Sequence, residues 1–387
     1  MIAAWVQKDW WTGAATLLLL AAAAIYLHSV TFDPSAPALG NNTVSVHDSS
    51  VAGRPARDNQ RPIDEVLADL PSRERGRYPI VWIGNSHQHA INDIKPGDEL
   101  SSVVLHKLLN GDVWPGARPV FGISFSNLHF QEQLVLTVAL ALMEPDHRPR
   151  LIIHGVRFHD ARELGVRHSL RTLLTTPEFA KWLKSVEEAG RYPALVDSIK
   201  EDVALANTEK QRDKGAESWL MDNVADRLPI LERRGLIYGN TLNALHQLRD
   251  RVFMIDTKSK RPILAGRYKL AIDSLELALA VAKEAGIAVL LYNVPIRPGV
   301  ESPYVPAQYS QFRDDLKRIA AQSGAQFADY DGLIPSKLWG TWYDTDYPDY
   351  SHFTGEGHRI LAAQVRRDFA PYIVDRRVMS RQVHAVQ

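Results

Sequence analysis

Three polar residues in this sequence have the types and the order needed to activate a serine for attack on an acyl carbonyl. Ser86 ends the apolar run YPIVWIGNS, and Asp349 and His352 stand three residues apart near the C-terminus. A serine hydroxyl is a poor nucleophile without a base, which an imidazole supplies. A carboxylate beside that imidazole holds the correct tautomer and stabilises the charged form. We therefore predict that these three residues are catalytic; the spacing favours Asp349 over Asp344 and Asp346 as the orienting carboxylate.

Acyl transfer also needs hydrogen-bond donors for the oxyanion that forms on the carbonyl. The backbone N–H groups of Ser86 and Gly122 are candidates, and a glycine lets the substrate approach closely. The alternative interpretation is that Gly122 only permits close packing of a strand against a helix.

A second reading of the same region is a metal-dependent hydrolase. His87 and His89 form a His-x-His pair after the first predicted strand, and His154, His159 and Asp160 offer further ligands at another strand end. The two imidazoles of a His-x-His pair at a helix start would point different ways, so we predict no metal site.

Ligands of α/β proteins collect at the carboxyl ends of parallel strands, so the elements around these residues decide whether they meet. Short apolar or β-branched runs predict strands, and longer amphipathic stretches predict helices. The strands are expected at 78–86, 119–124, 150–156, 287–295 and 325–332, and the helices at 127–144, 267–286, 311–324 and 353–365. This alternation predicts an α/β fold in three layers, with helices on both faces of a parallel sheet. The stretch from 160 to 265 lacks the alternation and is expected to be a helical insertion that caps one side of the site.

These motifs resemble those of the SGNH (GDSL-like) hydrolase superfamily. Ser86 in GNSH matches the first block of that family, Gly122 the second, and Asp349-x-x-His352 the last, over a domain from 78 to 375. The resemblance implies a serine esterase or acyltransferase that needs no cofactor. One departure matters: the family often has Gly-x-Asn after the third strand, where this chain has Gly155-Val156-Arg157. The resemblance therefore leaves Arg157 or Asn127 to replace the usual side-chain donor to the oxyanion.

The N-terminus predicts a membrane anchor. Residues 10–32 carry no charge, open with two tryptophans and contain TLLLLAAAAIYL. As a helix, this stretch would span roughly 35 Å, enough for a bilayer core. A cleaved signal peptide is the alternative, because Ala36-Pro37-Ala38 loosely fits a cleavage site. We expect a cytoplasmic tail at 1–9, a flexible linker at 33–77 and a C-terminal tail at 376–387, with the catalytic domain extracytoplasmic or periplasmic.

Within the superfamily, this layout looks most like the membrane-anchored D-alanine transfer protein of teichoic-acid modification and related exopolysaccharide O-acetylation proteins. That resemblance implies a membrane-bound O-acyltransferase as partner and a cell-envelope glycopolymer as substrate. Trp339, Trp342 and Tyr343, just before the Asp–His pair, could stack on sugar rings or seal the edge of the core.

Composition excludes other classes. The chain of 387 residues has 45 basic and 45 acidic residues, so its zero net charge gives no general attraction to nucleic acid. Zero cysteines exclude disulfides, thiolate-zinc sites and a cysteine nucleophile. The function expected first is an anchored serine acyltransferase or esterase. The alternative is a non-catalytic assembly factor that uses the same fold to bind polymer or a membrane partner.

Overall fold

The computed structural model describes residues 43–45, 63–68, 70, 79–111, 117–212, 260–341 and 348–373. Within these ranges, no helix combines the length and the apolarity needed to cross a membrane. The predicted anchor at 10–32 and the predicted tail at 376–387 lie outside the described residues.

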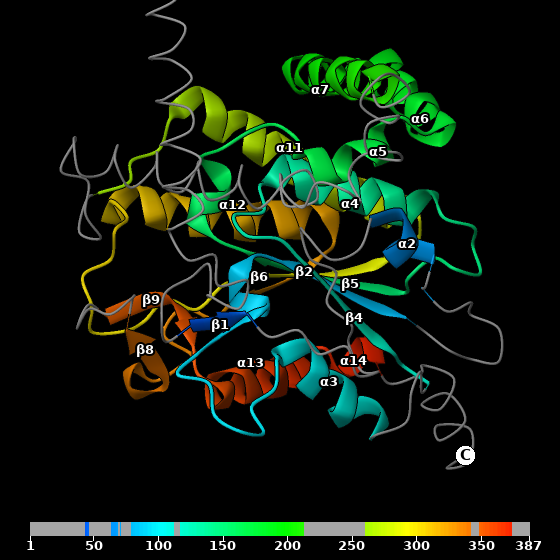
Figure 1. Cartoon of the computed structure of the whole chain (residues 1–387). Helices are drawn as coiled ribbons and strands as arrows, with labels where there is room; N and C mark the ends of the chain where they lie inside the picture. The colour runs from blue at the N-terminus through cyan, green and yellow to red at the C-terminus, as the bar shows by residue number, and fades with distance from the viewer. Residues whose placement is uncertain are drawn as a thin grey trace, which may run out of the picture. The chain divides into compact units, whose positions relative to one another are not determined.

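A five-stranded parallel sheet forms the centre of the described chain (Figure 1). Its strand order is β4-β2-β5-β6-β7, and every neighbouring pair is parallel. The strands are β2 Ile80–Gly84, β4 Val120–Ser124, β5 Leu151–Val156, β6 Ala288–Asn293 and β7 Gln326–Asp329. Each of them lies inside a run that the sequence predicts to be a strand, so the parallel α/β architecture is confirmed.

Helices cover both faces of this sheet (Figure 1). One face carries α4 Phe130–Leu142, α11 Ala265–Glu284 and α12 Pro306–Ser323, and the other carries α3 Ser101–Asn110, α13 Gly355–Asp368 and α14 Ala370–Ile373. Successive side chains of a strand point to opposite faces. In β2, Val81 and Ile83 accordingly join the core beneath α4, whereas Ile80 and Trp82 join the core beneath α13.

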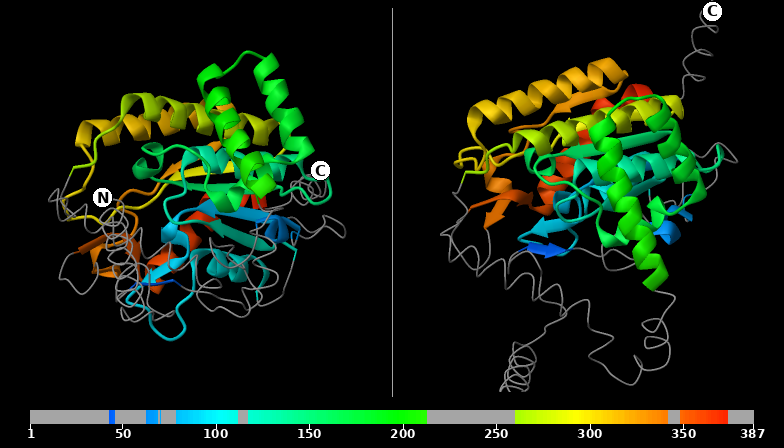
Figure 2. Two further views of the ribbon diagram at one scale, coloured as in Figure 1. Left: turned by 45° about the horizontal axis from the view of Figure 1, so that its top comes forward. Right: turned by 90° about the horizontal axis from the view of Figure 1, so that it is seen from above.

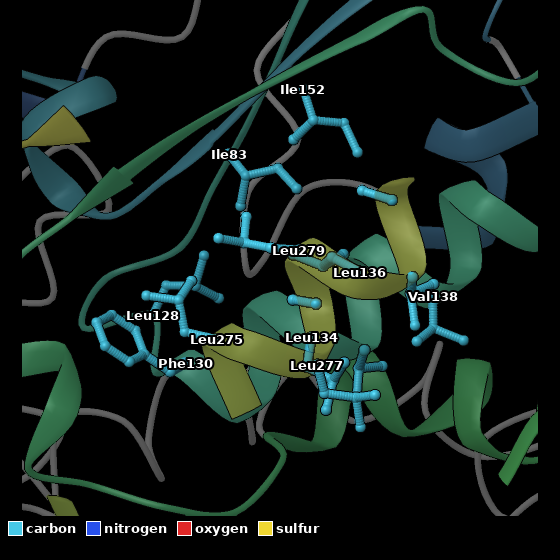
Figure 3. Packing of buried hydrophobic residues seen from close by; sticks show 14 of the residues in the cluster. Ile83, Leu128, Phe130, Leu134, Leu136, Val138, Ile152, Leu275, Leu277 and Leu279 are labelled. Carbon is cyan, nitrogen blue, oxygen red and sulfur yellow. The ribbon is translucent and has the colours of Figure 1, made fainter. Parts of the chain in front are cut away.

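The core on the α4 face consists largely of aliphatic side chains, which interdigitate between the sheet and two helices (Figure 3). Ile83 and Ile152 extend from the sheet toward Leu136 of α4 and Leu279 of α11. Both helices are apolar on most of their circumference, which is typical of helices that are buried on several sides. This packing fixes the strands whose ends carry the polar residues of interest.

The described part of the region from 160 to 265 is helical, and residues 213–259 lie outside the description. Its helices are α5 Arg171–Leu174, α6 Pro177–Glu188 and α7 Pro193–Arg212. Thr176 begins α6 by accepting the N–H of Phe179 on its hydroxyl at 3.2 Å, and Pro177 occupies the first helical position. Figure 2 shows α6 and α7, in green, side by side next to α4.

Two short antiparallel pairs, which the sequence analysis does not predict, lie outside the main sheet. β1 Thr43–Ser45 pairs with β3 Ala90–Asn92, and β8 Trp339–Thr341 pairs with β9 Pro348–Phe353. Asp349 and His352 therefore lie on a strand, and α13 begins directly after it.

Within the segment predicted as a linker at 33–77, the described residues form two short elements. Besides β1, it holds α2 Ile63–Ala68, which buries Ile63, Val66 and Leu67 in the core on the α4 face together with Leu70. The spacing of these four apolar residues is that of one helix face, and burying them stabilises the contact. The surrounding Pro, Gly and Ser residues obscure this short period in the sequence.

Candidate active site

The structure brings Ser86, His352 and Asp349 into one hydrogen-bonded row. His352 Nδ1 lies 2.8 Å from Asp349 Oδ2, and His352 Nε2 lies 2.9 Å from Ser86 Oγ. Because a carboxylate only accepts hydrogen bonds, the imidazole carries its proton on Nδ1 and accepts the serine hydroxyl on Nε2. All three side chains are buried, with Ser86 5% exposed and His352 1% exposed. The arrangement can move the hydroxyl proton to the imidazole.

Two separate sheets supply these side chains. Ser86 opens a 3-10 turn, η2 Ser86–Gln88, directly after β2, where Asn85 leaves the strand in extended conformation. The carboxyl end of a parallel strand is where such a side chain meets its partners. His352 and Asp349 come from β9 of the two-stranded pair.

Asp349 is fully buried and its carboxylate has a complete set of donors. The backbone N–H groups of Ser351 and His352 donate to Oδ1 at 2.7 and 3.1 Å. The amide of Asn92 donates to Oδ2 at 2.9 Å. Hydrogen bonds of this kind compensate for the loss of water around a buried charge. Asp349 is therefore held rigidly behind the imidazole.

Sequence reasoning missed Asn92. It lies on β3, is fully buried, and also donates to the Thr341 carbonyl at 3.2 Å. Its side chain occupies the space that a Cβ on Gly340 would need, so the glycine permits this close approach. A lone Asn in a short strand carries no motif, and only the pairing of distant segments reveals it.

Asn85 and His87, the residues on both sides of Ser86, belong to a buried network of hydrogen-bonded side chains. The Asn85 amide donates to both carboxylate oxygens of Asp160 at 3.0 Å, and Asn85 Oδ1 accepts a short hydrogen bond from His87 Nδ1. On its other side, His87 Nε2 accepts from the hydroxyl of Tyr292 at 3.0 Å. These contacts hold the turn that presents the serine.

Burial sets the protonation of Asp160 and His87 in this hydrogen-bond network. Burial raises the pKa of Asp160 to about 7, against the lowering effects of the nearby Arg157 charge and of the donors around the carboxylate. Burial also lowers the pKa of His87 well below its usual value, with the Arg157 charge as the next cause, so this imidazole stays neutral. A neutral His87 matches its hydrogen bonds, which need one donor and one acceptor nitrogen.

Arg157 follows β5 and reaches toward the histidine side of the site. Its guanidinium donates to Ser351 Oγ at 2.7 Å, and its backbone N–H donates to Asp160 at 2.8 Å. Nearby Tyr304, Asp160 and Tyr350 raise the pKa of Arg157 in spite of its burial, so the charge is permanent. Arg157 thus contacts Asp160 through its backbone N–H and Ser351 through its guanidinium.

Gly122 lies inside a strand rather than at the strand end that the oxyanion prediction needs, whereas the predicted role of Asn127 stays a prediction. Gly122 is in the middle of β4, in register with Trp82, and a Cβ there would meet Ser102 of α3 at 3.0 Å. Its register partner Trp82 precedes Ser86 by four residues, so Gly122 lies inside the sheet and away from the serine. Its role is to allow close packing of α3 on the strand. Asn127 is exposed in the loop after β4 with a φ of 54°, and its carbonyl accepts from Arg167 at 3.3 Å.

The histidines considered for a metal site have separate partners. His89 lies 3.0 Å from Ser124 Oγ, away from the partners of His87, and His154 contacts Gln133 and Thr137 of α4 at 3.2 Å. Among the residues that the structure describes, no group of three or more His, Asp or Glu side chains could hold a metal ion.

Trp339 seals the edge of the core. It is 5% exposed, its indole N–H donates to the Ile334 carbonyl at 3.1 Å, and its ring packs edge-on against Phe353. Of the two roles that the sequence left open for Trp339, the structure shows the sealing of the core edge. Trp342, Tyr343, Asp344 and Asp346 lie outside the described residues.

No protein-family model matches the sequence, and no curated protein is similar enough to count as a match. Among solved structures, a GDSL-like lipase from Bacteroides thetaiotaomicron is 11% identical with a TM-score of 0.36, covering 80% of this chain and 95% of its own. An acetylxylan esterase from Geobacillus stearothermophilus is 11% identical with a TM-score of 0.35, covering 75% and 93%. A carbohydrate esterase family 2 enzyme from Myceliophthora fergusii is 10% identical with a TM-score of 0.36, covering 78% and 69%.

Because these similarities are distant, the chemistry of the site rests on the contacts described above. The special likeness to the D-alanine transfer protein stays a prediction. The solved structures to which this chain is distantly similar are thus a GDSL-like lipase, an acetylxylan esterase and a carbohydrate esterase of family 2.

Proposed function

We propose that this protein is a serine-dependent acyl esterase or acyltransferase. The observation that carries the proposal is the row from Ser86 Oγ through His352 to Asp349, with contacts of 2.9 and 2.8 Å. Ser86 and His352 are 266 residues apart in the sequence, and His352 and Asp349 are 3 apart. Their hydrogen bonds run in the order that activates a hydroxyl: the serine bonds to the imidazole, and the imidazole bonds to the carboxylate.

In the proposed reaction, Ser86 Oγ attacks the carbonyl carbon of an acyl ester while His352 Nε2 takes the hydroxyl proton. Asp349 stabilises the resulting imidazolium. The backbone N–H of Ser86 donates to the oxyanion, and the proton returns from His352 to the departing alcohol. This leaves an acyl-enzyme. Water or a second hydroxyl then gives its proton to His352 and attacks the acyl carbonyl, and His352 passes that proton to Ser86 Oγ as the acyl–serine bond breaks.

The acceptor decides between esterase and transferase, because both share this site and differ in how water is excluded. We propose that the acceptor is a hydroxyl of a cell-envelope or exopolysaccharide glycopolymer. In this proposal, the segment at 10–32 anchors the chain with its catalytic domain outside the cytoplasm, beside a membrane-bound O-acyltransferase. The charge-free apolar sequence of that segment supports the anchor.

The test is labelling of the full-length chain with a fluorophosphonate, which reacts with activated serines, followed by peptide mass spectrometry. We expect an adduct on Ser86 that is absent in Ser86→Ala and at least about 10³-fold slower in His352→Ala. Ser185→Ala is a matched control, because this exposed serine lies within α6 and its hydroxyl only donates to the Trp182 carbonyl at 2.6 Å. Absence of an adduct in the folded wild type would contradict the proposal and favour a non-catalytic assembly factor.

A further inference from the structure

We propose that Arg157 and Asp160 are positioning residues that tie the nucleophile turn to the strand that carries the histidine. The inference rests on the proposed function, because it concerns the reactivity of Ser86. It assigns a role to η3 Phe158–Ala161, the short turn after β5, and to the arginine that precedes it.

Asp160 holds the nucleophile side. Its two carboxylate oxygens accept the Asn85 amide, and Asn85 in turn accepts from His87, so both neighbours of Ser86 are fixed. Asn85 and Asp160 are each 1% exposed. Without water to replace these partners, a break in the chain leaves buried polar groups unpaired, which is costly.

Arg157 holds the histidine side. Its guanidinium donates to the hydroxyl of Ser351 at 2.7 Å. Ser351 is the residue before His352, and its own N–H donates to Asp349 at 2.7 Å. A displacement of Ser351 therefore moves the imidazole and its carboxylate together.

Hydrogen bonds within the turn from Arg157 to Asp160 join the contacts on the nucleophile side to those on the histidine side. The Arg157 N–H donates to Asp160 Oδ2 at 2.8 Å, and the Asp160 N–H donates to the Arg157 carbonyl at 3.0 Å. Ser86 follows a strand of the main sheet, whereas His352 lies on β9 of a separate pair, so the packing of either sheet alone does not set their separation. The Arg157–Asp160 turn spans that boundary, and this is the reason for its proposed effect on the Ser86–His352 distance.

The charged and polar groups around the turn support the same role. Asp160 faces the positive Arg157, the neutral amide of Asn85 and, farther off, the negative Glu132. The two side chains bind different partners, because the Arg157 guanidinium donates to Ser351 and the Asp160 carboxylate accepts the Asn85 amide. Each side chain therefore fixes one side of the site.

The test compares fluorophosphonate labelling rates and the kcat and KM for p-nitrophenyl acetate in the full-length chain. The variants are Asp160→Asn, Arg157→Gln and their combination. We expect each single change to slow labelling and to lower kcat by about 10²-fold, with KM little changed, because a misplacement of roughly 1 Å has that effect. The double variant should be no slower than the slower single one, since the turn is already broken. Arg318→Gln on α12 is the matched control and should label like the wild type.

Ser351→Ala is a milder variant that removes only the hydroxyl bound by Arg157, and we expect slower labelling there as well. It keeps the test decisive if the arginine variants do not fold. Labelling of Ser86 in the wild type, with Asp160→Asn and Ser351→Ala within twofold of it, would overturn the positioning role and leave the proposed function intact. Independent, multiplicative losses in the double variant would also overturn it. No labelling of the wild type would instead defeat the proposed function.

Discussion

At the residue scale, Asp349 shows how a buried charge is kept in place. Two backbone N–H groups, the imidazole of His352 and the amide of Asn92 donate to its two oxygens. Each donor satisfies an acceptor site that would otherwise be unpaired in the core. Asn92 is the only one of these donors that a substitution can remove without altering the backbone or the proposed catalytic residues.

Asn92→Ala should slow fluorophosphonate labelling of Ser86 by about 10-fold or more, because a hydrogen bond to a charged group contributes about 1.5–3 kcal/mol. Asn110→Ala is a matched control. That amide donates to the carbonyls of His106 and Arg118 at 3.0 and 2.8 Å, at the end of α3, and concerns stability alone. Equal labelling rates in the two variants would contradict a specific role for Asn92.

At the element scale, the loop between β4 and α4 depends on one ion pair. Glu132, in the first turn of α4, is 1% exposed and accepts from Arg167 Nε at 2.7 Å and from the Arg167 backbone N–H at 2.9 Å. The same guanidinium donates to the carbonyls of Ser126 and Asn127 at 3.0 and 3.3 Å and lies over the Phe125 ring. A residue of the helical region thus holds a loop that follows a strand of the main sheet.

Arg167→Met should lower the free energy of unfolding by about 3 kcal/mol or more, because it leaves the buried Glu132 charge without its partner. Lys184→Met is the matched control: Lys184 pairs with Glu188 on α6 at 3.7 Å, and the two side chains are 75% and 67% exposed. An exposed pair contributes less than about 1 kcal/mol. Denaturant unfolding followed by circular dichroism measures both, and similar losses would show that burial does not distinguish the two pairs.

At the scale of the whole molecule, buried histidines link folding to pH. Burial lowers the pKa of His154 and of His358 from 6.5 to about 3, and both side chains are fully buried. Between these values the unfolded chain binds a proton at each site that the folded chain does not, so stability is complete above about pH 6.5 and falls toward pH 3. Asp160 acts in the opposite sense: its raised pKa of about 7 makes the folded chain bind the extra proton between the ordinary value of 3.8 and 7.

We expect the histidines to dominate, because among the described residues burial lowers the pKa of five of them, His87, His129, His154, His159 and His358, whereas it raises the pKa of three carboxyl groups, Asp160, Asp202 and Asp331. The free energy of unfolding should therefore decrease from pH 6.5 to pH 4.5, by up to about 1.4 kcal/mol per pH unit for each uncompensated histidine. Urea unfolding at several pH values measures this slope. His154→Gln should make the slope shallower; an unchanged slope would show that His154 does not contribute.

Much of the architecture is predictable from local sequence. All five strands of the main sheet lie within predicted runs. β2, β4, β5 and β6 are largely buried, and a strand buried on both faces is a short, nearly continuous apolar segment. The Ser86, Asp349 and His352 set is also readable, since their types, order and placement after a strand and before a helix all carry information. Helix α2 could also be predicted from its helical apolar spacing, but six residues are too few for that period to be distinguished from the surrounding sequence.

The remaining features depend on contacts between segments that are distant in the sequence, where no spacing rule applies. Asn92 acquires its importance only because β3 is brought beside Asp349, 257 residues later. Gly122 is explained by the Ser102 side chain across the sheet face, and Trp339 by the interior that covers it. The sequence by itself thus determined the sheet and the reactive residue types, whose physical causes are local periodicity and chemical identity. Only the tertiary structure decided which polar groups are buried together, because desolvation and hydrogen-bond pairing depend on the packing of the whole chain.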